Sequence, residues 1–193
     1  MIARTHDVAA FTALVVIFIL MPPQTMTLAT AIIAVLANLI GGVTPDIDQP
    51  TAPLWRNLPI GKYFGKAFAA MLGGHRFLTH SLLGFVIFAL LSRMVLVFLH
   101  PIMPTVSIDI VWWAFIIGML SHLVMDTLTK EGVPWLLPIP VKFGFPPIKS
   151  LRITTDKWVE LWVVFPVLLA FNGWFYFSHY TQLLLLLKNT IVY

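Results

Sequence analysis

Long apolar stretches constrain this chain more than any other feature of its sequence. A helix that crosses a membrane needs roughly 20 mostly apolar residues. The stretches that approach this length are Val8–Met21, Met26–Ile40, Leu82–Leu99, Ile108–Thr127 and Trp158–Phe177. Only 10% of the 193 residues are charged, whereas a soluble domain carries about 25% charged residues. We therefore expect an all-α membrane protein, with residues 1–193 forming a single domain built on a bundle of about five transmembrane helices.

The segments between and after these stretches are expected to lie at the membrane surface. Leu54–Leu72 mixes aromatic residues with Lys62 and Lys66, a composition that suits an interfacial segment on an anionic inner leaflet. Leu136–Ser150 is rich in proline and is expected to be an irregular loop, re-entrant where protein covers it. The tail Tyr180–Tyr193 is too short to span, and we expect it on the surface or against the bundle.

The lysines and arginines predict the orientation of these helices, because they are retained on the cytoplasmic side. The loop after the second stretch contains Arg56, Lys62, Lys66 and Arg76, and the loop after the fourth contains Lys130, Lys142, Lys149, Arg152 and Lys157. The loops after the first and third stretches contain none. The N-terminus is therefore predicted inside and the C-terminus outside. Since topology alone explains the net charge of +4, no nucleic-acid partner is expected.

Acidic residues and histidines gather at the cytoplasmic ends of the predicted helices. Of the 8 acids only Asp109 is assigned outside, and of the 6 histidines only His100 and His179. The remaining ones arrive from five separate passages of the chain, which favours a shared site over a random distribution. Cysteine is absent, so any metal at such a site would be held by nitrogen and oxygen.

Two of these passages flank the second and fourth stretches. His122 and Asp126 are four residues apart, so they share one helix face about 6 Å apart and suit a single ion. The pair Gly41-Gly42 is expected to break the second helix, with Thr44 as the cap of a new turn. Asp46 and Asp48 would then sit in a tight turn with both carboxylates facing a cation.

A third passage opens the helix predicted at Leu82–Leu99. Thr79 is expected to cap this helix, which places His75 in the preceding loop and His80 in the first helical turn. Glu160 lies in the first turn of the last predicted span, where the helix dipole favours an acid even without a catalytic role.

Imidazole and carboxylate groups together suit zinc, manganese or iron, and a subset rich in carboxylates suits magnesium. Zinc is the first expectation, with manganese or magnesium as alternatives. Seven residues are candidate ligands: His6, Asp46, Asp48, His75, His80, His122 and Asp126. They exceed the needs of one ion, so either two ions are bound or some residues orient ligands and transfer protons.

The same residues resemble a known family. The chain contains, in order, Thr5-His6, Pro45-Asp46-Ile47-Asp48, His75-Arg76-x-x-Thr79-His80-Ser81, Ser121-His122-x-x-x-Asp126, Gly132-Val133 and Leu137-Pro138. This set is similar to the YdjM-like family of bacterial and archaeal inner-membrane proteins, described as LexA-regulated, membrane-bound, metal-dependent hydrolases. The resemblance runs over nearly the whole chain and implies that the seven candidate ligands are site residues. Two departures stand out: Gln49 replaces a histidine that is common in the family, which bears on the number of ions, and Phe77 replaces a glycine.

Residues and resemblance together predict a metal-dependent hydrolase of the cytoplasmic membrane. One or two divalent ions would lower the pKa of a bound water for attack on an ester or phosphoester. The position at the inner interface favours an amphiphilic, phosphate-bearing substrate such as a membrane lipid or prenyl phosphate. The residues expected to take part in catalysis are His75, His80, Arg76 and Glu160, with Arg76 and Arg152 as clamps for an anionic group.

Two other functions stay open from the sequence. A transporter of metal ions or protons would need polar residues through the depth of the membrane, whereas here they stop at one side, with Arg93 the main exception. No inverted repeat is visible either. A structural or regulatory membrane protein would use a metal only to fix the ends of its helices.

Overall fold

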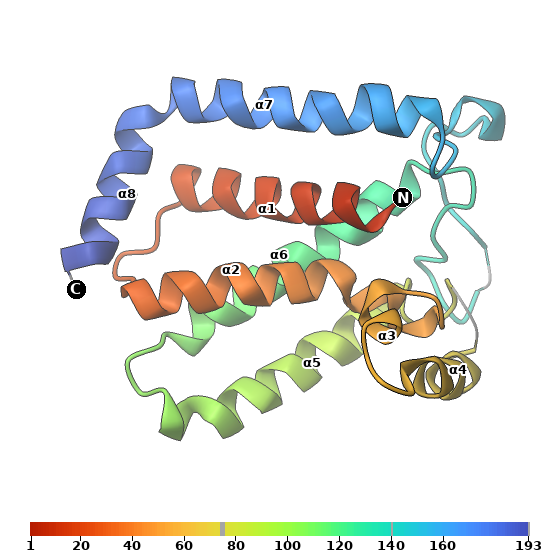
Figure 1. The fold of residues 1–193 in the computed structure, drawn as a ribbon, viewed down its shortest axis with the longest axis horizontal. Coiled ribbons are helices and arrows are strands. Elements are labelled where there is room, and N and C mark those ends of the chain that lie inside the picture. Colours follow the sequence, from red (N-terminus) through yellow and green to blue (C-terminus); the bar gives the residue numbers. More distant parts are fainter. Residues whose placement is uncertain (74–75, 140, 193) are drawn as a thin grey trace.

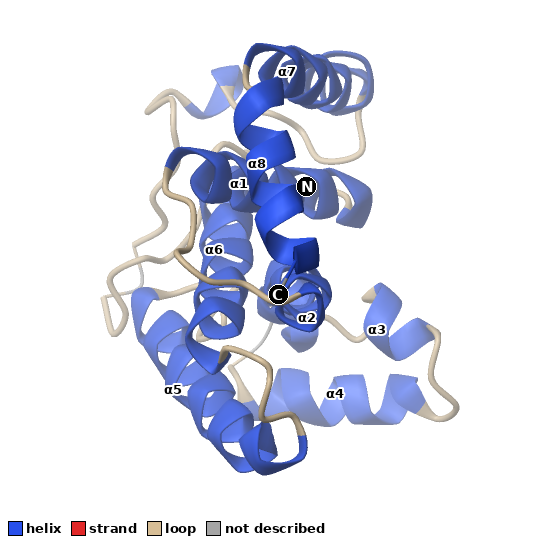
Figure 2. Ribbon diagram, turned by 90° about the vertical axis from the view of Figure 1, so that its left-hand side faces the viewer, coloured by secondary structure: helices blue, strands red, loops and turns tan. Residues whose placement is uncertain are grey.

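In the computed structural model, which describes residues 1–73, 76–139 and 141–192, the chain is helical (Figures 1 and 2). Its helices are α1 (Ala3–Leu20), α2 (Leu28–Val43), α3 (Pro53–Arg56), α4 (Gly61–Met71), α5 (Leu82–Leu99), α6 (Ile108–Thr127), α7 (Phe165–Ser178) and α8 (Tyr180–Val192). Extended pairing within these described ranges is limited to two isolated bridges. Five helical segments are long and apolar enough to cross a membrane. The predicted all-α membrane architecture is confirmed.

The helix α6 lies at the centre of the arrangement, where it contacts α1, α2 and α5. Figure 1 shows α7, α1 and α2 running side by side, with α6 crossing behind α2. The short helices α3 and α4 lie at the right-hand end in this view, together with the loops that join α6 to α7. The terminal helix α8 crosses the opposite end and touches α1, α2 and α7, so the tail does pack against the bundle.

The close crossing of α2 and α6 depends on two glycines. A Cβ atom on Gly41 would collide with the backbone carbonyl of Phe115, and one on Gly118 would collide with that of Asn38. The expectation that Gly41-Gly42 ends the second helix is therefore wrong, because α2 continues through both residues. Glycine is used here to let two backbones approach, which is a frequent device in membrane helices.

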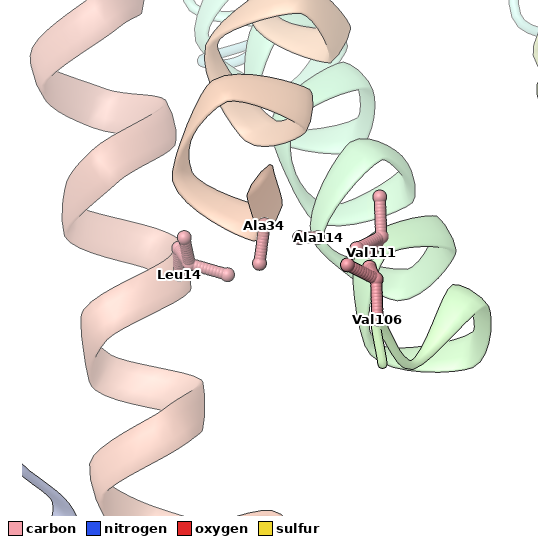
Figure 3. Close-up of a cluster of buried hydrophobic side chains, with 5 residues drawn as sticks. All are labelled: Leu14, Ala34, Val106, Val111 and Ala114. Atoms are coloured by element: carbon pink, nitrogen blue, oxygen red, sulfur yellow. The ribbon is translucent and has the colours of Figure 1, made fainter. Parts of the chain in front are cut away.

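Buried apolar side chains form one cluster between α5 and α6, around Ala89 and Met119, and another toward the end of the bundle away from α3 and α4. Leu14, Ala34, Val106, Val111 and Ala114 are almost completely buried there and join α1, α2 and the start of α6 (Figure 3). Small residues at Ala34 and Ala114 allow the backbones to approach, as expected where dispersion rather than the hydrophobic effect drives packing in lipid.

The observed boundaries of the first and the last span depart from the predicted ones. α1 begins at Ala3, five residues before the predicted start, so His6 lies inside the helix. The last span begins with a π-helical turn, Glu160–Val164, which continues into α7. Hydropathy places the centre of a span better than its ends, because polar residues that pack against protein do not interrupt a helix. The proline-rich segment around Leu136–Ser150 is irregular over its described residues, as predicted.

Candidate metal centre

Ionisable side chains from four parts of the chain meet at the end of the bundle that carries α3 and α4. His6 comes from the first turns of α1, and His122 and Asp126 come from the last turns of α6. Asp46 lies in the 3₁₀ helix η1 (Thr44–Asp48), which follows α2 directly, and His80 lies just before α5. We refer to these five residues, His6, Asp46, His80, His122 and Asp126, as the candidate metal centre.

The five residues form two overlapping triads that share His122. In the triad of His6, His122 and Asp126, and again in the triad of Asp46, His80 and His122, potential ligand atoms all lie within 4.8 Å of one another. The imidazole rings of His6 and His122 stack with their centroids 3.7 Å apart and their planes 10° apart. Separate transmembrane helices thus bring imidazole and carboxylate groups within the distances at which one or two ions could be shared.

Burial makes these side chains costly unless their polar atoms are satisfied. His6, His80, His122 and Asp126 are at most 1% exposed, and Asp46 is 19% exposed. Among the described residues, neither ring nitrogen of His6 has a hydrogen-bond partner, and neither does Nε2 of His122. Nε2 of His6 lies 3.3 Å from Oδ1 of Asp126, outside hydrogen-bond geometry. Buried nitrogens of this kind beside carboxylates fit a divalent cation of the zinc type.

His122 is oriented by the backbone of α2. Its Nδ1 lies 2.6 Å from the carbonyl oxygen of Gly42. A carbonyl can only accept, so Nδ1 donates and Nε2 carries the free lone pair, which lies 3.7 Å from carboxylate oxygens of both Asp46 and Asp126. A hydrogen bond from the second ring nitrogen to a carbonyl is the usual way in which proteins orient a histidine ligand.

Asp48 is fully buried beside the centre, where it contacts the loop that carries His80. One of its oxygens, Oδ2, accepts hydrogen bonds from the Thr79 hydroxyl and from the backbone N–H of Arg76, the latter at 3.0 Å. The same oxygen lies 3.5 Å from Nδ1 of His80. Both carboxylates lie beside the His80 ring, Asp46 at 3.7 Å from Nε2 and Asp48 at 3.5 Å from Nδ1. The expectation that the two face one cation stays a prediction.

The loop before α5 differs from its predicted form. Ser81, rather than Thr79, caps α5, since its hydroxyl accepts a hydrogen bond from the N–H of Gly84 at 3.0 Å. His80 therefore lies outside the helix, and the Thr79 hydroxyl is left to contact Asp48 and the His80 ring. Thr44 likewise does not cap a new turn, because its hydroxyl donates to the carbonyl of Ile40. In both places the tertiary contacts of the centre override a plausible local cap.

The pKa of His80 reflects two opposing effects. Burial by itself lowers this pKa, but the nearby carboxylates of Asp126 and Asp48 raise it by more, so that the pKa lies above the ordinary histidine value. The ring thus sits in a strongly electronegative environment, which also favours a cation at Nε2.

Arg76 is a buried part of this end of the bundle. Its guanidinium pairs with Oδ2 of Asp126 at 2.8 Å and donates to the Thr129 hydroxyl at 2.9 Å. The α-ammonium group of Met1 pairs with the other oxygen of Asp126 at 2.7 Å. An ion that binds Asp126 would compete with these two groups. Arg76 is 6% exposed, and most of its donors are already used within the protein.

The bonds found for Glu160 and Arg152 among the described residues go to backbone groups and not to the five clustered side chains. Glu160 is fully buried and accepts the backbone N–H groups of Ile2 and Asp156, each at 2.7 Å, so that it ties α1 to the start of the last span. Arg152 donates to two proline carbonyls within its own loop. His75 lies outside the described residues.

A cavity of about 290 Å³ opens onto the centre, and both His6 and Asp46 line it. Its remaining wall includes Val43 and Leu58, with Asn57 as a further polar side chain. We refer to this cavity as the site mouth. Sequence reasoning missed Asn57, because a single asparagine in a loop carries no pattern that separates it from an ordinary turn residue.

Comparison with known proteins is consistent with this architecture. The chain is 38% identical over 104 residues to the inner membrane protein YdjM of Escherichia coli (strain K12), and equally to that of Shigella flexneri. These alignments cover 53% of this chain and 47% of each relative, so the match spans about half the length of those proteins. It is also 28% identical over 140 residues to the YvsG protein of Bacillus subtilis (strain 168), over 72% of this chain and 76% of that protein.

No solved structure matches the chain significantly. The model of the family described as YdjM inner membrane protein matches residues 1–185, which is nearly the whole chain and includes every helix that contributes to the candidate metal centre. Together with the apolar helices, the match indicates a multi-pass protein of the inner membrane. The chain therefore belongs to the YdjM family of inner membrane proteins.

Proposed function

We propose that this protein is a metal-dependent hydrolase whose active site lies at the cytoplasmic end of the bundle, with the N-terminus inside and the C-terminus outside. The observation that carries the proposal is the convergence of His6, Asp46, His80, His122 and Asp126 from four parts of the chain. Among the described residues, both ring nitrogens of His6 and Nε2 of His122 are buried there without a hydrogen-bond partner. The loops richest in lysine and arginine lie at the same end, which supports the proposed orientation.

The donor set would hold one or two divalent ions, with zinc as the first candidate and manganese or magnesium as alternatives. Two imidazoles and a carboxylate form a common zinc environment. Such an ion would polarise a water or an ester oxygen at the site. Gly42, through its carbonyl, and Asp48, through Thr79, would hold His122 and His80 in orientation.

The structure also offers a residue that could accept a proton from the attacking water, and a cavity through which a substrate could reach the site. If His6, His122 and Asp126 hold an ion, His80 remains beside Asp46 with Nε2 3.7 Å from its carboxylate, where it would serve as general base. His75 stays a predicted ligand or catalytic residue. The site mouth, at about 290 Å³, is at the small end of ligand pockets and suits a headgroup rather than a whole lipid.

The amphiphilic substrate proposed from the sequence fits this mouth. Val43 and Leu58 give it an apolar wall, whereas His6 and Asp46 give it a polar floor. An ester or phosphoester could therefore enter while the attached chains stay in the bilayer. A purely structural metal site would need no such opening, and this favours the hydrolase over the structural role.

The experiment uses the full chain purified in detergent. Metal content is measured by elemental analysis, and turnover is measured with bis(p-nitrophenyl) phosphate and a p-nitrophenyl ester as probes. We expect bound metal and metal-dependent turnover in the wild type, both lost in Asp126→Ala. Asp109→Asn, which alters an exposed acid at the opposite end, is the matched control and should retain both. Turnover that survives complete removal of metal would overturn the proposal.

A further inference from the structure

A second hollow, of about 730 Å³, lies beside the site mouth and is formed by α3, α4 and the turn between them. Its wall carries the cationic side chains of Arg56, Lys62 and Lys66 and the aromatic rings of Trp55 and Tyr63. We refer to it as the basic hollow. Leu58 lines both the basic hollow and the site mouth, so the two openings adjoin.

Within the part of the chain that the structure describes, the cations of the basic hollow form no ion pair with an acidic side chain. No aspartate or glutamate occurs between Gln49 and Ser81, and the ion pairs found among the described residues all involve other groups. Lys62 and Lys66 are four residues apart on one face of α4, where like charges repel. Lys62 also lies in the first helical turn, where the helix dipole favours an anion. An anion in the hollow would relieve both effects.

Close packing fixes the hollow next to the candidate metal centre. A Cβ on Gly61 would collide with the carbonyl of Trp55, and one on Gly65 would lie 2.9 Å from the Trp55 ring, so both positions need glycine for α4 to approach α3. The indole N–H of Trp55 donates to the carbonyl of Ile47 at 2.9 Å. Since Ile47 is the residue after Asp46, this bond ties the hollow to the 3₁₀ turn of the centre.

The surface around the hollow is apolar as well as basic. Tyr63 is 74% exposed and Met71 is 78% exposed, and Ile60 and Phe64 are also exposed on the same segment. A site for a soluble anion would need only the cations. Exposed apolar and aromatic side chains beside lysines are instead typical of a segment that lies in the interface of an anionic leaflet.

We propose that the basic hollow binds the phosphate headgroup of an anionic membrane phospholipid, whose acyl chains stay in the adjacent bilayer. The shared wall at Leu58 would place that lipid beside the site mouth. Lipid binding is inferred from the charges and the cavity alone. The further inference that the bound lipid is a substrate rests on the proposed hydrolase function.

The test is native mass spectrometry of the full chain in detergent, titrated with dioleoyl phosphatidylglycerol or with dioleoyl phosphatidylcholine. We expect the wild type to retain the anionic lipid about tenfold better or more, since each cation near a bilayer surface adds to anionic-lipid affinity. The variant Lys62→Gln/Lys66→Gln should lose this preference. The matched control Lys142→Gln/Lys149→Gln removes two cations from the other basic loop and should keep it. An unchanged thermal midpoint confirms that both variants are folded.

Equal retention of the two lipids by the wild type, or an unchanged preference in Lys62→Gln/Lys66→Gln, would overturn the headgroup site. Displacement of phosphatidylglycerol by millimolar inorganic phosphate would show that the hollow recognises free phosphate and would overturn the lipid assignment. Because lipid retention needs no turnover, the two proposals fail separately. If the wild type retains the anionic lipid but shows no metal-dependent turnover, only the hydrolase proposal is overturned.

Discussion

The two ends of the helix bundle use opposite means to hold the same helices together. At the end shown in Figure 3, α1, α2 and α6 meet through small and aliphatic side chains, and the nearby ion pair of Arg93 and Asp109 is exposed. At the other end α1 and α6 meet through His6, His122 and Asp126, which are almost fully buried, and the His122 ring also bonds the Gly42 carbonyl of α2. Burying ionisable groups is the costlier of these two means. Their cost in a membrane therefore points to function.

The strongest test of this difference between the two ends is to remove His122, the histidine that both triads share. We expect His122→Ala to lose nearly all bound metal and to reduce metal-dependent turnover by about 100-fold or more, because both triads lose a ligand. Elemental analysis and the phosphodiester assay measure these effects. His100→Ala removes an exposed histidine at the apolar end and should change neither quantity. Full metal content in His122→Ala would contradict the assignment of the centre.

A smaller effect is expected from the hydroxyl that orients His80. Thr79→Val keeps the shape of the side chain but removes its bonds to Asp48 and to the His80 ring. We expect metal affinity to fall by about 10–100-fold, the usual effect of losing an orienting partner. The measurement is competition with a chelator of known affinity.

Ser81→Ala is the matched control for Thr79→Val. It removes the cap of α5, so we expect a loss of stability of about 1 kcal/mol with metal affinity nearly unchanged. If the two variants lose affinity equally, Thr79 acts only through the folding of the loop.

A substitution in the apolar end should lower the stability of the protein and leave metal binding unchanged. Leu14 is 2% exposed within the apolar cluster, so Leu14→Ala is expected to cost about 2 kcal/mol or more through lost packing. The thermal midpoint in detergent measures this loss, and metal content per folded chain should stay at the wild-type value. A parallel fall in metal content would mean that the two ends are coupled through α6.

Substitution of Glu160 is expected to have the smallest effect on turnover. It tests whether Glu160 belongs to the catalytic site or only holds backbone groups. The N–H groups of Ile2 and Asp156 donate to different oxygens of Glu160, so Glu160→Gln keeps an acceptor for only one of them. We expect a loss of stability of about 1 kcal/mol or more and a small change in turnover. A general base would behave differently, with a loss of about 100-fold or more and a changed pH profile. That outcome would restore the catalytic role predicted from the sequence.

Hydropathy and motif spacing predicted much of this molecule, and the failures are local. The spans Leu82–Leu99 and Ile108–Thr127 match α5 and α6 residue for residue. The interval between His122 and Asp126 placed both on one face, because helix periodicity depends on sequence alone. The cap of α5 was predicted wrongly, because Thr79 bonds Asp48 instead of capping the helix. The end of α2 was predicted wrongly, because Gly41 serves the close approach to Phe115 of α6 and does not stop the helix.

The amino-acid sequence by itself determined that the chain is a membrane bundle and that most of its acids and histidines lie near the same ends of the predicted spans, because hydropathy and charge act residue by residue. Only the tertiary structure decided that Asp48 accepts the Thr79 hydroxyl and the Arg76 N–H, that Arg76 pairs with Asp126, and that a basic hollow adjoins the site mouth. These features depend on helix crossings and on side-chain directions after a turn. Both are set by close packing between segments that are far apart in the chain.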